Sequence, residues 1–115
     1  MSIYSKIPLS NSTNGKGIIV TKTSTPGTSI HTAVSGTSSF DEIWLYAYNN
    51  SVSATKLTIE FGSFLEEDNI ELSIPGESGL VLVLPGLFLQ NSLVITAFAP
   101  VANVISIHGY VHRVS

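Results

Sequence analysis

The sequence predicts an all-β protein: a single-domain antiparallel β-sandwich, jelly-roll-like, of about eight strands, with an extended N-terminal arm. Short runs rich in valine, isoleucine, threonine and aromatic residues recur along the chain, separated by glycine, proline and asparagine turns. No run of helical length shows a helical period. The chain has 115 residues and no cysteine, so it is long enough for one core without disulfides. An up-and-down or immunoglobulin-like arrangement would use the same strands.

Residues 1–15 predict the extended arm, and the sandwich domain is expected to span residues 16–115. The arm is polar and turn-rich, and Pro8 prevents a helix. It is either a frayed terminus or a segment that lies along a neighbouring subunit. In the second case its apolar side chains are contact residues. These are Ile3, Tyr4, Ile7 and Leu9.

Two strands are expected between the arm and the centre of the chain. Residues 16–23 (KGIIVTKT) are rich in β-branched side chains, and a Pro-Gly pair shortly after them predicts a turn. Residues 29–34 (SIHTAV) predict an alternating strand, with Ile30 on one face and His31 on the other.

Residues 41–50 (DEIWLYAYNN) predict the central strand, which is apolar on both faces. Because successive side chains of a strand point to opposite sides, one face is aliphatic and the other is aromatic. The protein's own core can cover only one of them. The aromatic residues, which therefore need a second cover and are candidate contacts, are Trp44, Tyr46 and Tyr48.

Residues 55–62 (TKLTIEFG) predict a strand with one wet face. Its apolar side chains alternate with Lys56, Thr58 and Glu60, which are expected to face water. The turn-rich residues 49–51 predict that this strand forms a hairpin with the central one.

The strands that follow are predicted by the same signals. Residues 63–69 (SFLEEDN) predict a loop or one helical turn, and residues 70–74 (IELSI) predict a half-buried strand. Residues 104–114 (VISIHGYVHRV) predict the last strand, with Ile105, Ile107 and Val111 opposite a polar and aromatic face.

Two further runs are apolar on both faces: residues 79–84 (GLVLVL) and residues 92–99 (SLVITAFA). Between them Pro85-Gly86 predicts a turn, followed by a loop at residues 87–89. Apolar side chains outside the core are thus expected here too. The candidate contact residues of this region are Leu87, Phe88 and Phe98.

Charge is scarce in this chain. Charged residues make up 11% of it, against about 25% in an ordinary soluble domain. The net charge is −3, with five lysine and arginine residues in all, too few to neutralise the phosphates of a nucleic acid. No membrane partner is expected either, because Pro85 interrupts the longest apolar run, residues 79–89. Few charges suit a surface covered by neighbouring subunits, although a monomer with a hydroxyl-rich surface has the same composition.

The histidines are the first candidates for catalysis or metal binding. His108 and His112 lie about 13 Å apart on a strand that rises about 3.3 Å per residue, too far to share one ion. One such histidine from each of several subunits could still bind a metal at a symmetry axis; exposed positions without a ligand are the alternative. No metal site is expected within one chain.

Other catalytic patterns are missing from the sequence. The acidic stretch at residues 66–68 lacks the alternating ligands of a calcium loop, and PGESG around Ser78 is not G-x-S-x-G. We expect no enzyme, no catalytic residue and no cofactor. Aromatic side chains can also stack on sugars, which makes a carbohydrate-binding module the alternative. That platform would consist of Trp44, Tyr46, Tyr48 and Tyr110.

Several stretches carry a resemblance: residues 31–33 (HTA), DEIWLYAYNN, LTIEFG, GLVLVLPG and the closing IHGYVHR. From about Thr28 on, the chain resembles the cement, or decoration, proteins of tailed-bacteriophage capsids. The resemblance implies a β-sandwich subunit that assembles on the outer capsid surface and clamps adjacent capsomers. It implies two partners, the major capsid protein and further copies of the chain, for which we expect a trimer rather than a dimer. It carries over no catalytic residue, only the aromatic strand and GLVLVLPG as contact surfaces.

We therefore expect a non-enzymatic virion structural protein that is made in the host cytoplasm and located on the outer capsid surface. The alternative is a carbohydrate-binding β-sandwich module of a phage tail or fibre. The expected oligomer or capsid contacts are Ile3, Tyr4, Ile7, Leu9, Trp44, Tyr46, Tyr48, Leu87, Phe88 and Phe98.

Overall fold

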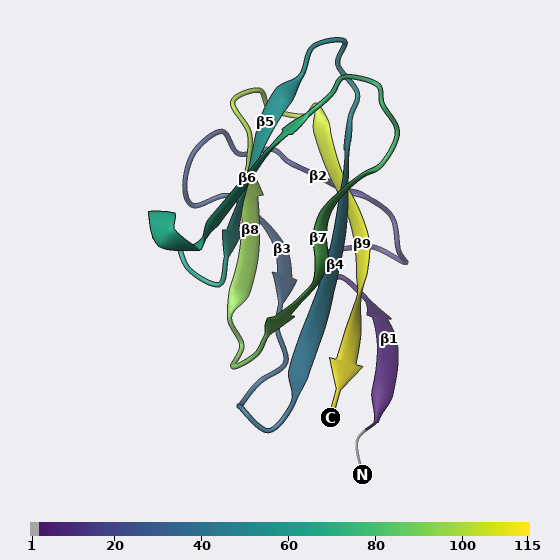
Figure 1. Ribbon diagram of the computed structural model, residues 1–115, viewed down its shortest axis with the longest axis vertical. Coiled ribbons are helices and arrows are strands. Elements are labelled where there is room, and N and C mark those ends of the chain that lie inside the picture. The colour runs from purple at the N-terminus through teal and green to yellow at the C-terminus, as the bar shows by residue number, and fades with distance from the viewer. Residues whose placement is uncertain (1–2) are drawn as a thin grey trace.

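The computed structural model describes residues 3–115 as two antiparallel β-sheets packed face to face (Figure 1). Sheet A has the order β1-β9-β4-β7, and β2 also pairs with β9. Its strands are β1 (Tyr4–Pro8), β2 (Ile18–Ile19), β4 (Phe40–Asn49), β7 (Val81–Leu89) and β9 (Ile105–Val114). Sheet B has the order β3-β8-β5-β6. Its strands are β3 (Thr28–Thr32), β5 (Thr55–Phe61), β6 (Asn69–Ile74) and β8 (Val94–Phe98). The predicted single-domain antiparallel sandwich is confirmed.

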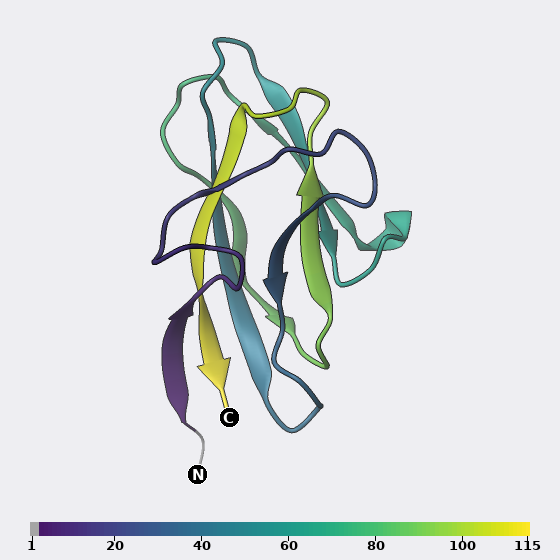
Figure 2. The same ribbon diagram turned by 180° about the vertical axis from the view of Figure 1, so that it is seen from behind.

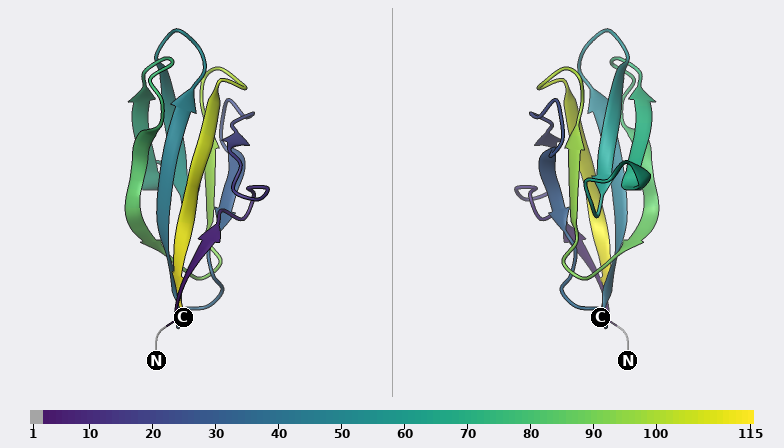
Figure 3. Two further views of the ribbon diagram at one scale, coloured as in Figure 1. Left: turned by 90° about the vertical axis from the view of Figure 1, so that its right-hand side faces the viewer. Right: turned by 90° about the vertical axis from the view of Figure 1, so that its left-hand side faces the viewer.

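The connections interleave the two sheets. The β1–β2 and β5–β6 connections stay within one sheet, and the others cross. Figure 3 shows the sandwich from the side of sheet A (left) and from the side of sheet B (right). The jelly-roll path stays a prediction, with which this strand order agrees. The acidic stretch forms a single 3₁₀ turn, η1 (Glu66–Asp68). Between residues 3 and 115, no helix is long and apolar enough to cross a membrane.

The predicted hairpin of residues 41–50 and 55–62 is wrong, because β4 and β5 lie in different sheets. β4 pairs instead with β9 on one side and β7 on the other. Its last residue, the buried Asn49, donates its side-chain amide to the carbonyl oxygens of Ser53 at 2.8 Å and Ile74 at 3.0 Å. These bonds satisfy the buried Ile74 carbonyl and hold the Ser53 carbonyl where the chain leaves sheet A for sheet B. The turn residues predict a turn, but they do not specify which sheet the next strand joins.

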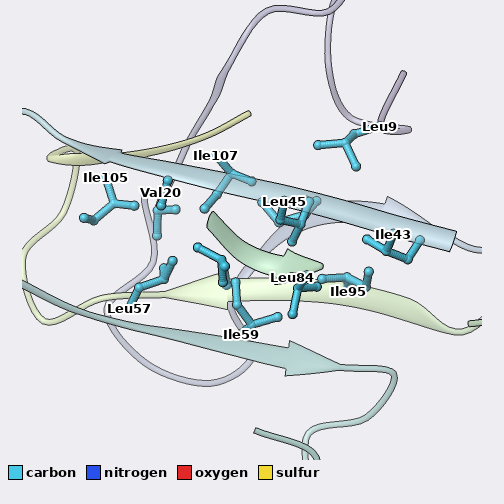
Figure 4. Packing of buried hydrophobic residues seen from close by; sticks show 14 of the residues in the cluster. Leu9, Val20, Ile43, Leu45, Leu57, Ile59, Leu84, Ile95, Ile105 and Ile107 are labelled. Atoms are coloured by element: carbon cyan, nitrogen blue, oxygen red, sulfur yellow. The ribbon is translucent and has the colours of Figure 1, made fainter. Parts of the chain in front are cut away.

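The core between the sheets is aliphatic (Figure 4). The alternation predicted for the central strand is confirmed, since every second residue from Asp41 to Asn49 is buried and the residues between them are half-buried. Leu57 and Ile59 of β5 and Ile95 of β8 meet these side chains from sheet B, each with 0% of its surface exposed. Fully burying such a side chain contributes about 1.5–3 kcal/mol.

β1 lies within the predicted arm, but it is an edge strand of sheet A and pairs with the C-terminal half of β9 (Figure 2). Ile7 packs against the core, and Leu9 is 1% exposed. The free edge of β9 and the burial of these two side chains explain why this stretch joins the sandwich. The sandwich therefore begins by Tyr4 and not at the predicted boundary. Met1 and Ser2 of the predicted arm lie outside the described residues.

The predicted turn at Pro85-Gly86 is wrong, because β7 continues through it to Leu89. Two register shifts in the β4–β7 pairing absorb the extra residues. Such bulges accommodate a proline, whose nitrogen cannot donate a ladder hydrogen bond, and β7 is the edge strand of its sheet. Residues 87–89, predicted as a loop, are therefore strand.

The predicted wet face of β5 is partly covered, since Thr58 is 3% exposed and Glu60 is 1% exposed. The connection between β2 and β3 folds over it. There Thr25 Oγ1 and, at 2.8 Å, the Gly27 N–H donate to the Glu60 carboxylate, and Thr96 Oγ1 of β8 donates at 2.6 Å. Burial raises the pKa of Glu60, but these hydrogen bonds outweigh it and hold the pKa below 4.5. The alternating pattern of β5 could not show a cover that comes from a distant segment.

Candidate functional site

The outer face of sheet A gathers aromatic side chains from four strands. Because alternate side chains of β4 enter the core, those between them point outward. The β4–β9 register then places Trp44 beside Tyr110, and the β4–β7 register places Glu42 beside Phe88. We call this surface the aromatic face. Its members are Tyr4, Phe40, Trp44, Tyr46, Tyr48, Phe88 and Tyr110.

The rings of the aromatic face contact one another across the strands. Phe40 and Phe88 stack with their centroids 4.7 Å apart and their planes at 22°. Trp44 and Tyr110 are stacked at 6.1 Å and 14°. Aromatic pairs of this kind add about 0.5–1.5 kcal/mol to the burial of their area. The face holds all four tyrosines of the chain and its only tryptophan.

Gly86 allows the indole of Trp44 to lie close against β7. The glycine lies at a bulge with φ +76°, and a Cβ atom there would be 2.9 Å from Cζ2 of Trp44. Glycine alone adopts positive φ without steric cost and leaves room for the ring. The indole Nε1 is buried and has no hydrogen-bond partner among the described residues. Packing therefore positions this side chain.

Few charges lie on the aromatic face. The Lys6 ammonium sits 4.3 Å from the ring centroid of Tyr110, a cation–π contact. Glu42 and His112 approach to 3.6 Å, and the His112 ring is packed against Tyr110. The Lys6, Glu42 and His112 side chains therefore already have interaction partners within the chain.

The two outer faces of the sandwich differ in polarity. The β7 margin of the aromatic face is apolar, with Leu82 47% and Phe88 55% exposed. The outer face of sheet B carries threonines and an exposed ion pair between Lys56 and Glu71, 3.2 Å apart. Other exposed apolar side chains, such as Phe64 and Leu65, lie in connections between strands. A surface on which aromatic and apolar side chains adjoin one another is typical of interaction sites. We therefore take the aromatic face as the candidate functional site.

Half of the ten predicted contact residues lie together on the aromatic face, and the others lie elsewhere. The residues on the aromatic face are Tyr4, Trp44, Tyr46, Tyr48 and Phe88.

The prediction of Leu9 as a contact residue is wrong, because Leu9 lies in the core. Ile7 and Leu87 also pack against the core, since strand alternation points them away from their outward neighbours. Phe98 pairs with Thr58 on the outer side of sheet B, and Ile3 is exposed at the start of the described chain.

The contact residues predicted from the sequence leave out Phe40; Leu82 is included only as part of GLVLVLPG, and Tyr110 only as part of the sugar-stacking platform. A signal for Tyr110 is present, because alternation places it opposite the buried residues of its strand. The β4–β9 pairing that sets Tyr110 beside Trp44 joins distant segments and has no local signature.

A buried polar cluster lies where β3, β4 and β9 meet. The His31 and Asp41 side chains, 1% and 0% exposed, are joined by a 2.8 Å bond between Nε2 and Oδ2. The Arg113 guanidinium donates to both Asp41 oxygens, at 2.8 and 3.0 Å. The N–H and the hydroxyl of Ser10 lie 3.0 and 2.9 Å from His31 Nδ1. The predicted alternation of residues 29–34 is wrong at His31, because a bulge turns it inward beside the equally buried Ile30.

This cluster has the composition of a serine–histidine–aspartate triad but not its chemistry. The Nδ1 lone pair that would take the serine proton already faces the Ser10 N–H. The carboxylate that would stabilise an imidazolium is bound by Arg113. Burial lowers the pKa of His31 below 6.5, against the opposing effect of Asp41. Burial raises the pKa of Asp41, but hydrogen bonds from Arg113 and His31 hold it below 3.8. The arrangement suits structural anchoring.

Metal-binding geometry and similarity to known proteins are the two remaining sources of information about the site. No three His, Cys, Asp or Glu side chains within the described part of the chain are placed to hold a metal ion. A polar hollow lies elsewhere, lined by Glu66, Asn69 and Glu71. No family model, curated protein or solved structure matches the chain.

Proposed function

We propose that this chain is a non-enzymatic structural protein of a tailed-phage virion, a cement protein that forms trimers on the outer capsid surface and bridges capsomers. The observation that carries the proposal is the gathering of all four tyrosines and the only tryptophan on the outside of one sheet. The phage origin and the capsid partner rest on the sequence resemblance. The aromatic face supports the part of the proposal that concerns assembly.

The chemistry of the aromatic face fits a contact between proteins. Interface cores are rich in tyrosine, tryptophan and phenylalanine and poor in lysine and glutamate. Burying an exposed side chain such as Phe88 or Leu82 contributes up to about 1.5–3 kcal/mol. Rings that already pack on one another lose little side-chain freedom on binding, so more of this contribution remains as affinity.

The edges of sheet A favour association through its face. Pro85 and two bulges interrupt β7 at one edge, and Pro8 ends β1 at the other. Prolines and bulges hinder the addition of a further strand. A partner of sheet A is therefore expected to lie on the aromatic face.

Replacing Phe88 with serine should weaken self-association by about four- to fifteenfold, because 55% of this side chain remains to be buried, full burial contributes about 1.5–3 kcal/mol, and about 1.4 kcal/mol represents a factor of ten. Sedimentation velocity over a concentration series measures the change. Phe64 provides the matched control, since it is 58% exposed but lies in the β5–β6 connection. Phe64→Ser should leave association unchanged. A wild-type protein that stays monomeric at high concentration, or equal effects of the two variants, would contradict the proposal.

The same pair of variants tests capsid attachment. Purified protein is mixed with capsids that lack it, and bound copies are counted after co-sedimentation; Phe88→Ser should reduce them and Phe64→Ser should not. Point variants suit this test better than deletion of residues 1–15, which would remove β1 from its sheet and Leu9 from the core.

A carbohydrate-binding module of a phage tail or fibre is the second candidate. The nearly parallel Trp44 and Tyr110 rings favour it, because hydrogen-bonding groups of Lys6, Glu42 and His112 lie around them. A glycan array separates the candidates. Sugar binding that Tyr110→Ala abolishes, in a folded protein whose association state is unchanged, would favour the sugar-binding module.

A further inference from the structure

We propose that His31 is a pH-sensitive latch, which holds the segment after β1 on the sandwich while its ring is neutral and releases residues 3–17 when acid protonates it. The structural basis is the position of Nδ1, which accepts the backbone N–H of Ser10 at 3.0 Å. The latch is independent of the proposed function.

The contacts of both ring nitrogens define the neutral form. Nε2 lies 2.8 Å from Oδ2 of Asp41, an acceptor, so Nε2 carries the proton. Nδ1 faces a backbone donor, so it carries none. Protonation at Nδ1 would set its N–H against the Ser10 N–H and remove the acceptor of that N–H. The Ser10 hydroxyl, 2.9 Å from Nδ1, can accept from the protonated ring, but it does not replace the acceptor that the N–H loses.

The segment that this bond holds crosses from β1 to the edge of β3. Leu9 fills the core, and the Asn11 N–H donates to Ile30 O at 3.2 Å. The side chain of Asn11 donates to Ser29 O at 2.7 Å in an exposed position. The Ser10 hydroxyl also accepts the Thr32 N–H at 3.1 Å in an exposed position. Exposed hydrogen bonds can exchange with water, so the part-buried bond to His31, whose ring is 1% exposed, is the one that water replaces least readily. Loss of this bond frees the segment together with β1.

The groups that face His31 come from every element packed around it. β4 contributes the Asp41 carboxylate, β9 the Arg113 guanidinium, and the segment after β1 the neutral Ser10. On β8, the apolar Ile95 is paired with His31. Since Arg113 already binds both oxygens of Asp41, the carboxylate only partly compensates a charge on the ring.

The direction of the pH effect follows from these contacts. Burial holds the pKa of His31 below 6.5, so the folded state binds fewer protons than an opened state whose histidine titrates near 6.5. The latch is fully closed above that pH, and it opens as the pH falls below it. Asp41 and Glu60 stay ionised until more acid conditions, because their pKa values lie below 3.8 and 4.5.

Hydrogen exchange tests the latch on the wild-type protein. Peptides from residues 3–17 are compared with peptides from β5 and β8 at about pH 7.5 and about pH 5, after correction for intrinsic exchange. The opening constant can rise up to about tenfold per pH unit below the unfolded-state pKa. We expect faster corrected exchange in residues 3–17 at the lower pH, by up to about thirtyfold for the 1.5 pH units between 6.5 and 5, and little change in β5 and β8. No change in residues 3–17, or an equal change in all peptides, would overturn the proposal.

Two variants identify the groups involved. His31→Asn places an amide oxygen near the position of Nδ1 and does not titrate, so the difference between the two pH values should disappear. Ser10→Ala removes the hydroxyl and keeps the N–H, so the difference should remain. An acid effect that persists in His31→Asn, or is absent from Ser10→Ala, would contradict the latch. Ring nitrogen NMR shifts supply a separate check, because the wild-type ring should carry its proton on Nε2 at neutral pH and lose this pattern where exchange accelerates.

Discussion

Replacing Asp41 with alanine should lower the free energy of unfolding by up to about 3–5 kcal/mol, the range for removal of one partner of a fully buried ion pair; the Arg113 side chain left behind is 33% exposed and is partly solvated. Asp41 has no exposed surface, and it accepts hydrogen bonds from Arg113, His31 and, at 3.2 Å, the Val34 N–H. These donors belong to segments that meet only in the folded sandwich. Chemical denaturation of Asp41→Ala and the wild type measures the loss.

A double-mutant cycle with Arg113→Ala and the Asp41→Ala/Arg113→Ala double variant measures the interaction between the two side chains. If the two side chains stabilise one another, the double variant should cost less than the sum of the single ones. A pH series adds a second readout. Because the pKa of Asp41 lies below 3.8, its contribution is present above that pH and lost as the pH falls through the folded pKa. The acid side of the stability curve should therefore be flatter in Asp41→Ala. A loss below about 1 kcal/mol would contradict the structural role of the cluster.

The sequence predicts those parts of the fold that depend on alternation and local turns. Alternating burial in β4, β6 and the first half of β9 agrees with the sequence pattern, because one face of each strand meets the core. The errors arise where distant segments decide the outcome. The β4–β5 hairpin is wrong because Asn49 supports a crossing to the other sheet, and Glu60 is buried by a connection more than 30 positions away in the sequence. Neither the crossing after β4 nor the burial of Glu60 can be recognised from the sequence of the strand concerned.

The candidate site is predicted in part for the same reason. β4 alone indicates an outward aromatic row, and the structure extends it with side chains from β1, β7 and β9. Leu9 and Phe88 are both apolar residues outside the central strand, yet one lies in the core and the other is 55% exposed. Composition cannot distinguish them, because the path of the chain through the sandwich decides which side each residue faces. The cluster of His31, Asp41 and Arg113 is likewise invisible to any short motif.

Replacing Gly109 with alanine should lower the free energy of unfolding by at least about 3 kcal/mol, through overpacking and backbone strain together. Gly109 pairs with Leu45 in the middle of the β4–β9 ladder. A Cβ atom there would lie 2.0 Å from the carbonyl oxygen of Trp44, and its φ is +157°. The obstacle is backbone of the neighbouring strand, which cannot move aside as a side chain can. β9 would have to separate from β4 where the core and the aromatic face are both anchored.

Gly36→Ala separates backbone strain from this contact. Gly36 has φ +75°, and a Cβ atom at this position would meet nothing within 4 Å beyond its chain neighbours. Alanine there should therefore cost only the strain of a positive φ, of order 1–3 kcal/mol. Trp44, the only tryptophan, reports the local change, because its backbone carbonyl is the group that Gly109→Ala would displace. Its fluorescence should change in Gly109→Ala and stay as in the wild type in Gly36→Ala. If Gly109→Ala keeps both the stability and the emission of the wild type, β9 does not lie against β4 in this register, and the pairing of Trp44 with Tyr110 that completes the aromatic face is refuted with it.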